Sequence, residues 1–377
     1  MAVAADVPSP SGWMELALQK AAEGLFRTSP NPRVGCVIAS AEGEVLGTGS
    51  TQRAGEAHAE IMALRDAQAR GHSTQGAIAY VTLEPCSHQG RTGPCCDALA
   101  AAGIAKVVAS LPDPNPLVGG RGFERLRAAG VAVEVGPGAA AAKALNLGFL
   151  SRMVRGSPWV RLKVAASIDG ITALPNGVSQ WITGEPARRD VHAWRARACA
   201  ILTGVGTILA DDPRMDVRGI DTPRQPWVAI VDSRLRTPPE AAVLQAQARD
   251  VVVYAAQPHA SREAALAAHG ATVVYLPDST GNRVDLGAVL RDLARRGANE
   301  LHVEAGAELN GALVTAGLVD ELLLYQAPRL LGAGRGISQF GPLESLADGL
   351  ELQVLSLDRV GEDIRLLAQV RGRADFV

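Results

Sequence analysis

Four residues in one short stretch of the chain have side chains that bind metals or transfer protons. His58 precedes Glu60 by two positions, and Cys86 precedes Cys95 by nine. A histidine and two cysteines are suitable zinc ligands, and three protein ligands leave one position of a tetrahedral site open for water. The metal makes such a water acidic enough to attack a substrate near neutral pH. We therefore expect zinc at His58, Cys86 and Cys95. Glu60 is the expected catalytic residue, which moves protons between the water and the substrate.

The elements expected around these residues can bring them together. Residues i and i+2 inside a helix point about 200° apart, so His58 and Glu60 share a pocket only if His58 lies at the start of the helix predicted there. Cys86 begins a loop, and Cys95 follows Pro94 at a predicted helix start, where the helix N-terminus favours a thiolate. The order H-x-E, then P-C, then C is that of zinc-dependent deaminases of the cytidine-deaminase type.

A purely structural zinc site is the alternative interpretation. Such a site needs a fourth protein ligand, and Cys96 or His88 could supply one. This alternative leaves the position of Glu60 unexplained.

Composition limits the kind of protein and of partner. The chain has 377 residues, enough for two or three domains, and its hydrophobic fraction of 47% is ordinary for a globular protein. A formal net charge of −2 argues against a nucleic-acid partner without excluding one. The start of the chain lacks the pattern of a signal peptide, and the longest apolar stretch, residues 199–210, is too short to span a membrane. Five cysteines are not a disulfide framework. We expect a cytoplasmic protein that does not associate with membranes.

Short apolar runs alternate with helical patterns in the first half, which predicts a three-layer α/β domain. Strands are expected over residues 34–39, 44–49, 77–83, 105–111 and 131–135, and helices over residues 13–26, 57–70, 94–102 and 122–129. Residues 139–153 are expected to form a connecting helix, after which Gly156-Ser157-Pro158 interrupts the pattern. We place the domain boundary here, with domains over residues 1–153 and 154–377.

The second half is again predicted to be α/β. Strands are expected over residues 159–165, 200–203, 227–231, 251–254, 272–275, 301–304, 321–327, 350–360 and 363–370, the last two as an antiparallel hairpin. In the first of these strands, alternation places Arg161 and Lys163 on one face and Leu162 on the other.

The spacing of the cysteines indicates a particular family. Eight residues separate Cys86 from Cys95, whereas cytidine and tRNA deaminases usually show two. This loop resembles that of the bifunctional riboflavin-biosynthesis deaminase/reductases. Other segments that resemble this family are Asn31-Pro32-Arg33-Val34-Gly35-Cys36, Asp113-Pro114-Asn115-Pro116, Ser179-Gln180-Trp181-Ile182-Thr183 and Val303-Glu304-Ala305-Gly306. The resemblance covers nearly the whole chain.

The resemblance implies two reactions. The N-terminal, cytidine-deaminase-like domain would remove an amine from 2,5-diamino-6-(5-phosphoribosylamino)pyrimidin-4-one. The C-terminal domain, with a dihydrofolate-reductase-like fold, would use NADPH to reduce the ribosyl group to ribityl. A homo-oligomer, a dimer or tetramer, is also expected. Two positions depart from the usual family pattern, Thr51 in place of a histidine and Gly93 in place of a proline.

The resemblance also assigns contacts with the small molecules. Asn31, Arg91 and Asn115 would contact the pyrimidine or its phosphate in the first domain. The two asparagines could instead be turn residues, and Arg91 a solvated charge. In the second domain the substrate contacts would be Lys163, Ser179, Arg195, Met215, Arg218 and Glu304. The cofactor contacts would be Ala165, Trp181, Thr207, Asp211, Ser233, Gly306, Ala307, Glu308, Leu309, Asn310, Gly311 and Ala312.

Several of these assignments have a structural alternative. Lys163 could be a surface lysine that extends to solvent, Trp181 a core residue, and Arg195 and Arg218 solvated charges on a helix face. Gly204-Val205-Gly206 lacks the third glycine of a dinucleotide fingerprint, since Leu209 stands there. For the whole chain, the alternative is a zinc deaminase of tRNA or free nucleotides with a non-catalytic C-terminal module.

Overall fold

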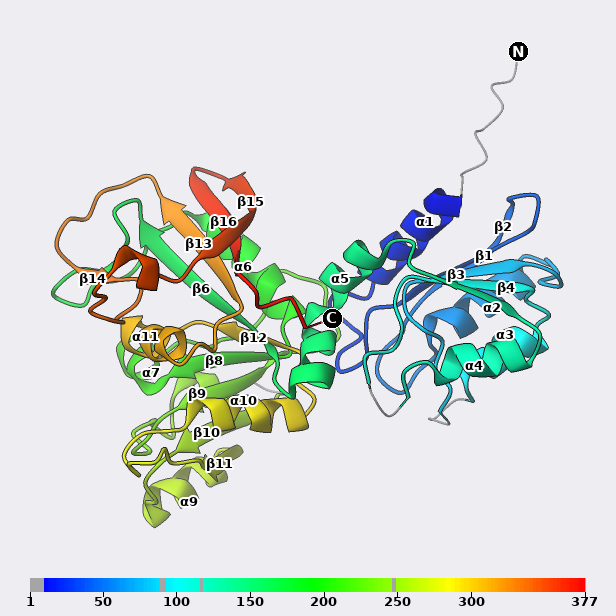
Figure 1. The fold of residues 1–377 in the computed structure, drawn as a ribbon. Helices are drawn as coiled ribbons and strands as arrows, with labels where there is room; N and C mark the ends of the chain where they lie inside the picture. Colours follow the sequence, from blue (N-terminus) through cyan, green and yellow to red (C-terminus); the bar gives the residue numbers. More distant parts are fainter. Residues whose placement is uncertain (1–9, 89–92, 116–117, 246–248, 377) are drawn as a thin grey trace. The chain divides into compact units, whose positions relative to one another are not determined.

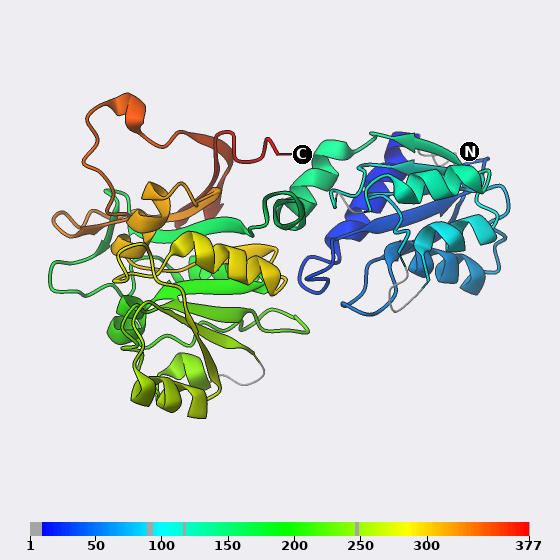
Figure 2. The same cartoon turned by 60° about the horizontal axis from the view of Figure 1, so that its bottom comes forward.

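The computed structural model describes residues 10–88, 93–115, 118–245 and 249–376 of the chain. It divides into two compact units, and the boundary along the chain lies between Val154 and Arg155. Figure 1 shows the elements of each unit, and Figure 2 shows them from a second direction.

The first unit is built on a five-stranded sheet with the order β2-β1-β3-β4-β5. β1 pairs antiparallel with β2 and β3, whereas β3, β4 and β5 are parallel. The strands are β1 (Gly35–Ala39), β2 (Val45–Ser50), β3 (Ile78–Val81), β4 (Lys106–Ala109) and β5 (Ala132–Val135). The helices are α1 (Pro10–Ala22), α2 (Ala59–Ala69), α3 (Cys95–Ala101), α4 (Arg121–Ala128) and α5 (Ala139–Arg155).

Helices cover both faces of this sheet. On one face, Trp13 and Ala17 of α1 pack against Val37 and Tyr80. On the other, a core cluster joins Ala63 of α2 and the residues of α3 and α4 to the opposite side of the same strands. The unit is therefore the three-layer, cytidine-deaminase-like domain that the sequence predicts, with each element within a few residues of its expected bounds (Figure 1).

Two glycines let α2 approach β2 closely. A Cβ atom added to Gly47 would lie 2.3 Å from the carbonyl oxygen of Ala63, and one added to Gly49 would lie 2.3 Å from that of Ala59. Real Cβ atoms do not come so near a backbone atom, so only glycine fits at either position. The start of α2, which carries His58 and Glu60, is thus held directly against β2.

The second unit contains a nine-stranded sheet with the order β11-β10-β9-β8-β12-β6-β13-β16-β15. The strands are β6 (Trp159–Ser167), β8 (Ala200–Gly204), β9 (Trp227–Val231), β10 (Val251–Ala255), β11 (Ala271–Tyr275), β12 (Glu300–Val303), β13 (Glu321–Ala327), β15 (Leu352–Val360) and β16 (Asp363–Val370). Neighbouring strands from β11 to β13 are parallel, and β16 and β15 continue the sheet as an antiparallel hairpin. All nine predicted strands are confirmed, and so is the hairpin.

Helices lie on both faces of the larger sheet. α10 (Leu286–Arg295) and α11 (Ala307–Thr315) share a core cluster with Leu162 and Val303. α7 (Val205–Asp211) and α9 (Ala260–Ala268) share another with Ile201. α6 (Glu185–Arg197) packs through Val191 against β13, and α8 (Ala242–Gln245) is a single turn. The unit has the α/β architecture that the sequence predicts and the dihydrofolate-reductase-like fold that the family resemblance implies.

A separate two-stranded ladder was not predicted from the sequence. β7 (Ile171–Ala173) pairs antiparallel with β14 (Arg335–Gly336). A 3-10 turn, η1 (Leu346–Asp348), follows before β15. Strands of two or three residues carry too little alternation to be recognised from their sequence.

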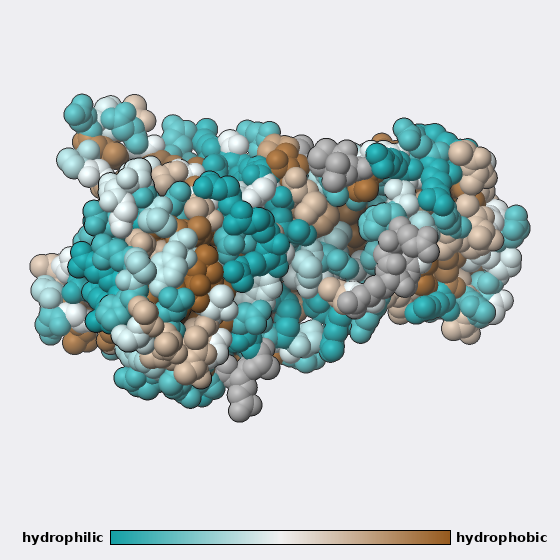
Figure 3. Space-filling model, turned by 90° about the horizontal axis from the view of Figure 1, so that it is seen from below, coloured by the Kyte–Doolittle hydropathy of each residue, from teal (hydrophilic) through white to brown (hydrophobic). Residues whose placement is uncertain are grey.

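On the face of the molecule shown in Figure 3, hydrophilic residues cover most of the surface of each unit, and hydrophobic residues reach the surface only in small areas. Most large apolar side chains of the described residues lie instead in the core clusters on either side of the sheets.

Among the described residues, no helix combines the length and the apolar character needed to cross a membrane.

Candidate functional site

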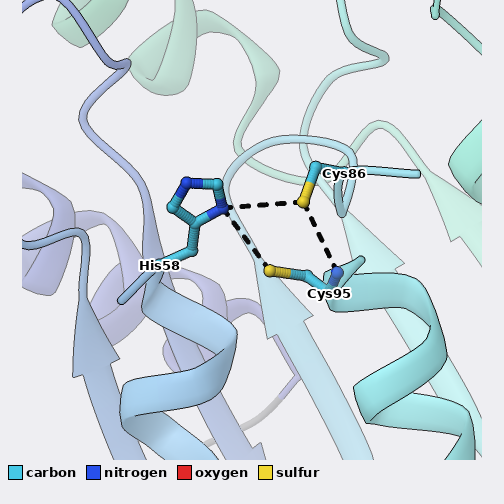
Figure 4. Close-up of side chains that lie close together, drawn as sticks. All are labelled: His58, Cys86 and Cys95. Atoms are coloured by element: carbon cyan, nitrogen blue, oxygen red, sulfur yellow. Dashed lines mark hydrogen bonds between the residues drawn. The ribbon is translucent and has the colours of Figure 1, made fainter. Parts of the chain in front are cut away.

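The three predicted metal ligands converge in the first unit from three separate segments (Figure 4). His58 immediately precedes α2, Cys86 lies in the loop after β3, and Cys95 is the first residue of α3. The Nδ1 atom of His58 lies 3.6 Å from Sγ of Cys86 and 3.5 Å from Sγ of Cys95. All three ligand atoms lie within 4.8 Å of one another.

These distances fit a tetrahedral zinc site. Zn–N bonds of about 2.0 Å and Zn–S bonds of about 2.3 Å at tetrahedral angles place nitrogen and sulfur about 3.5 Å apart. The local electrostatics also favour a metal ligand. Hydrogen bonds from the Cys95 thiol and the His58 imidazole hold the pKa of the Cys86 thiol at about 4, well below its ordinary value. The Cys95 backbone N–H also donates to Cys86 Sγ, at 3.4 Å.

Glu60 lies beside this cluster but is not part of it. It is the second residue of α2, and only 3% of its surface is exposed. Burial, together with the negative charge of Cys86, raises the pKa of Glu60 to about 7. The structure therefore places a buried carboxyl group next to the three ligand atoms, as expected for a proton carrier.

Neither proposed fourth ligand belongs to the metal-binding group found among the described residues. The Cys96 thiol turns to the carboxylate of Asp97, with Sγ 3.7 Å from Oδ1, and the residue is buried in the core beneath α3. His88 is exposed. The described part of the chain thus supplies three ligands, and the structural-zinc alternative lacks its fourth.

Glu84 anchors the loop that carries Cys86, a role that the sequence did not suggest. Its carboxylate accepts hydrogen bonds from four backbone N–H groups that lie outside its own loop. The donors are Asp113 (2.9 Å), Gly120 (2.9 Å), Gly122 (2.8 Å) and Phe123 (3.3 Å). The burial and the partners of Glu84 come from distant segments, so no sequence pattern indicates this role.

The predicted substrate contacts of the first unit lie in loops. Asn31 lies between α1 and β1, and its N–H donates to the carbonyl of Thr28 at 2.9 Å. Asn115 lies between β4 and α4, and its N–H donates to Asp113 Oδ1 at 2.9 Å. Both therefore have the turn contacts of the alternative interpretation, which leaves their side-chain role as a prediction. Arg91 lies outside the described residues.

Three predicted substrate contacts of the second unit meet at one carboxylate. Arg195 of α6 reaches Glu304, which directly follows β12, with Nε 2.5 Å from Oε1 and Nη2 3.0 Å from Oε2. Lys163 of β6 places Nζ 3.8 Å from Glu304 Oε2. Although burial favours the neutral acid, Arg195 and Lys163 hold the pKa of Glu304 far below its ordinary value. Lys163 is mostly buried, so the alternative of a surface lysine is wrong.

Asp216 brings two further predicted contacts toward this group. Its carbonyl oxygen accepts from Nη1 of Arg195 at 2.9 Å, and its carboxylate accepts from Nη1 of Arg218 at 2.7 Å. Met215, the preceding residue, is buried, with a positive φ of 50°. Sequence reasoning missed Asp216 because it lies in a loop with no pattern that indicates its contacts.

A second group forms around the end of α7. The side chains of Ser179 and Gln180 lie 3.4 and 3.3 Å from Oδ1 of Asp211. Trp181 is 63% exposed, and the Arg188 guanidinium lies 4.7 Å from its ring centroid. The interpretation of Trp181 as a core residue is therefore wrong. Thr207 lies in the same short helix as Asp211.

The remaining predicted cofactor contacts are distributed along the sheet. Gly306 precedes α11, whose first six residues are Ala307, Glu308, Leu309, Asn310, Gly311 and Ala312. Asn310 donates to the carbonyl of Ile337 at 2.9 Å, and a Cβ on Gly311 would lie 1.8 Å from the carbonyl oxygen of Gln339. These two residues thus hold the following loop. Ser233 follows β9, where its Oγ accepts from Val284 N at 3.3 Å, and Ala165 lies on β6.

Comparison with known proteins agrees with this division. Residues 9–111 match the family model of the cytidine and deoxycytidylate deaminase zinc-binding region, and residues 158–366 match the RibD C-terminal domain. One chain thus combines a zinc-binding deaminase region with a RibD-type reductase domain. The riboflavin biosynthesis protein RibD of Escherichia coli K12 is 46% identical over 367 residues, covering 94% of this chain and 97% of that protein.

Solved structures show the same relationship. A structure of Acinetobacter baumannii RibD superposes with a TM-score of 0.87 at 41% identity, covering 96% of this chain and 98% of that one. A Thermotoga maritima protein described as a diaminohydroxyphosphoribosylaminopyrimidine deaminase/5-amino-6-(5-phosphoribosylamino)uracil reductase superposes at 0.83 with 28% identity, covering 96% and 98%. The chain belongs to the RibD family of bifunctional deaminase/reductases in riboflavin biosynthesis. A deaminase with a non-catalytic C-terminal module is not favoured.

Proposed function

We propose that the chain catalyses two steps of riboflavin biosynthesis. The first is the zinc-dependent hydrolytic deamination of 2,5-diamino-6-(5-phosphoribosylamino)pyrimidin-4-one. The second is the NADPH-dependent reduction of the ribosyl group to ribityl. The observation that carries the proposal is the cluster of His58, Cys86 and Cys95 with Glu60 beside it, in a chain that also has a RibD C-terminal domain.

For the deamination, His58, Cys86 and Cys95 would hold zinc, which supplies a water of lowered pKa. Glu60 is buried next to the ligands without being one of them, so its carboxylate would accept a proton from the water. It then delivers a proton to the ring nitrogen and, in a later step, one to the departing amine. Oxygen from water replaces the amine on the ring carbon, and ammonia leaves.

For the reduction, Arg195 and Arg218 provide the positive charge for the substrate phosphate. Glu304 would accept hydrogen bonds from ribose hydroxyl groups, since its carboxylate stays ionised. Gly306 precedes α11 without a side-chain cap, so the free N–H groups of the first turn suit a cofactor phosphate. NADPH, when bound, supplies the hydride.

We further propose that residues 1–153 form the deaminase domain and residues 154–377 the reductase domain. The compact units meet one residue from this boundary, and the two family matches lie on either side of it. The proposed enzyme is a cytoplasmic homo-oligomer, a dimer or tetramer, that acts on a small molecule. Sedimentation velocity of the purified chain would reveal its assembly, and a monomer at all concentrations would contradict this part.

The decisive experiment is mass spectrometry of the product formed from the diaminopyrimidine phosphate. Without NADPH, the zinc-loaded protein should exchange one amino group for oxygen, and with NADPH the product should also gain two hydrogens. Glu60→Gln should keep its zinc and lose the first mass change, yet still reduce a supplied deaminated substrate. If the zinc-loaded wild type left the substrate mass unchanged, the proposed function would be wrong.

A further inference from the structure

His302 is a buried histidine that has no place in the site described so far. It lies in β12, near the middle of the nine-stranded sheet, and is fully excluded from solvent. Neither ring nitrogen has a hydrogen-bond partner among the described residues. Leaving a buried polar group without a partner is unfavourable, whereas an apolar side chain of similar shape would avoid that cost. If the position contributed only to packing, an apolar residue would give a more stable fold.

The surroundings of His302 determine its charge. Arg161 lies opposite it on β6 and is paired with Glu300 and Glu321, at 3.1 and 2.5 Å. Ile201, its neighbour on β8, is apolar. Lys163 on β6 and Arg195 on α6 add positive charge nearby. Burial, together with these cations, lowers the pKa of His302 to about 3 even though Glu304 opposes the shift.

A neutral imidazole has one N–H to donate, and the carboxylate of Glu304 lies close to it. His302 Nε2 lies 3.5 Å from Glu304 Oε1, slightly too far for a hydrogen bond. Oε1 is the oxygen that Arg195 Nε contacts at 2.5 Å. The other oxygen, Oε2, faces Arg195 Nη2 at 3.0 Å and Lys163 Nζ at 3.8 Å. Each carboxylate oxygen therefore has one close partner on Arg195 and one distant partner on the sheet.

This arrangement matters because Arg195 is a proposed phosphate ligand. The guanidinium edge that holds Glu304 in a bidentate pair cannot hold a phosphate in the same way at the same time. If substrate draws Arg195 away, Glu304 loses both close hydrogen bonds while it remains largely buried. An unpaired carboxylate in that environment would become protonated or change its orientation.

We propose that His302 is a positioning residue for Glu304. When Arg195 turns to the substrate phosphate, His302 donates its Nε2–H to Oε1 and Lys163 approaches Oε2. The carboxylate remains ionised and directed at the ribose. A shift of about half an ångström would bring His302 and Glu304 within hydrogen-bond distance. The inference rests on the proposed reductase function.

Two variants of His302 separate the donor role from packing. His302→Phe keeps a ring but removes the N–H, whereas His302→Gln keeps an N–H near the position of Nε2. We expect His302→Phe to lower kcat/KM of the reduction roughly 10- to 150-fold, the contribution of one hydrogen bond to a charged group. KM for the pyrimidine substrate should rise, KM for NADPH should stay unchanged, and His302→Gln should recover most of the activity.

The deaminase activity and the thermal stability of the same variants serve as controls. The rate of deamination should be unchanged in both variants. The midpoint temperature of thermal unfolding of His302→Phe should be no lower than that of the wild type near neutral pH. If His302→Phe fails to fold, the smaller His302→Leu takes its place in the same comparison.

The outcomes distinguish the inference from the proposed function. If the wild type reduces its substrate and His302→Phe does so equally well, the inference is overturned and the proposed function stands. Equal losses in the Phe and Gln variants would also overturn it, because the N–H would not be the feature required. A wild type that deaminates but does not reduce would overturn both the inference and the proposed reductase activity.

Discussion

Replacing His302 by phenylalanine should make the second unit less sensitive to acid. In the folded protein the pKa of His302 is about 3, so the imidazole stays neutral well below pH 5. In the unfolded chain a histidine has a pKa of about 6.5. The unfolded state therefore binds more protons between these two values, and the stability that neutral His302 provides is lost as pH falls through this window.

The magnitude follows from these two pKa values. Between about pH 7 and pH 5, the unfolded histidine changes from about one quarter protonated to almost fully protonated, while the folded one takes up almost no proton. Integrating this difference gives a loss of about 2 kcal/mol in the free energy of unfolding. The variant has no such group, so its stability should fall by about 2 kcal/mol less than that of the wild type over the same interval.

Urea unfolding at both pH values, followed by tryptophan fluorescence, measures this difference. Trp159, Trp181, Trp194 and Trp227 lie in the second unit and only Trp13 lies in the first, so the signal reports mainly on the relevant unit. Contributions from carboxylates are common to both proteins and cancel in the comparison. Parallel stability curves for wild type and variant would refute the reasoning, because they would mean that His302 is not buried in a neutral form.

Further predictions concern the metal, the loop that carries it and the cofactor. Cys86→Ser and Cys95→Ser should lose most of the bound zinc, whereas Cys96→Ser should keep it because the Cys96 thiol turns to Asp97. Elemental analysis measures the zinc content, and a Cys96→Ser protein without zinc beside a Cys95→Ser protein with zinc would reverse the ligand assignment. Glu84→Gln should lower the unfolding free energy of the first unit by roughly 1–3 kcal/mol, because its amide offers one acceptor oxygen to four backbone donors. A thermal midpoint equal to that of the wild type would contradict this. Arg234→Ala should weaken the use of NADPH by roughly 1.5–3 kcal/mol in kcat/KM and leave NADH almost unaffected, if this exposed arginine binds the 2′-phosphate. Equal losses with both cofactors would indicate a role in the fold.

The sequence predicted features that depend on local spacing. His58 and Glu60 are two positions apart, and they can share one pocket because His58 lies just before the helix, in an extended conformation. The position of Lys163 on its strand face follows from simple alternation. The same alternation places His302 on the face of Glu304, and applying it to β12 would have identified this residue.

Contacts between distant segments were not predictable in this way. Arg195 and Glu304 are 109 residues apart, and no periodicity relates a charge on a helix to one at a strand end. The exposure of Trp181 likewise depends on where its loop lies relative to the sheet. Only the folded chain shows that the Glu84 carboxylate accepts hydrogen bonds from the backbone of Asp113 and of the start of α4.

The close packing of β2 against α2 affects how variants of this enzyme should be interpreted. Gly47 and Gly49 touch neither metal nor substrate in the proposed mechanism, and a survey of ligand positions would classify changes there as remote. Yet any side chain at Gly49 collides with the first residue of α2, between His58 and Glu60. Natural or laboratory substitutions at these glycines should therefore be counted among those that affect deaminase activity. A variant that keeps all three zinc ligands can still have a disrupted deaminase site.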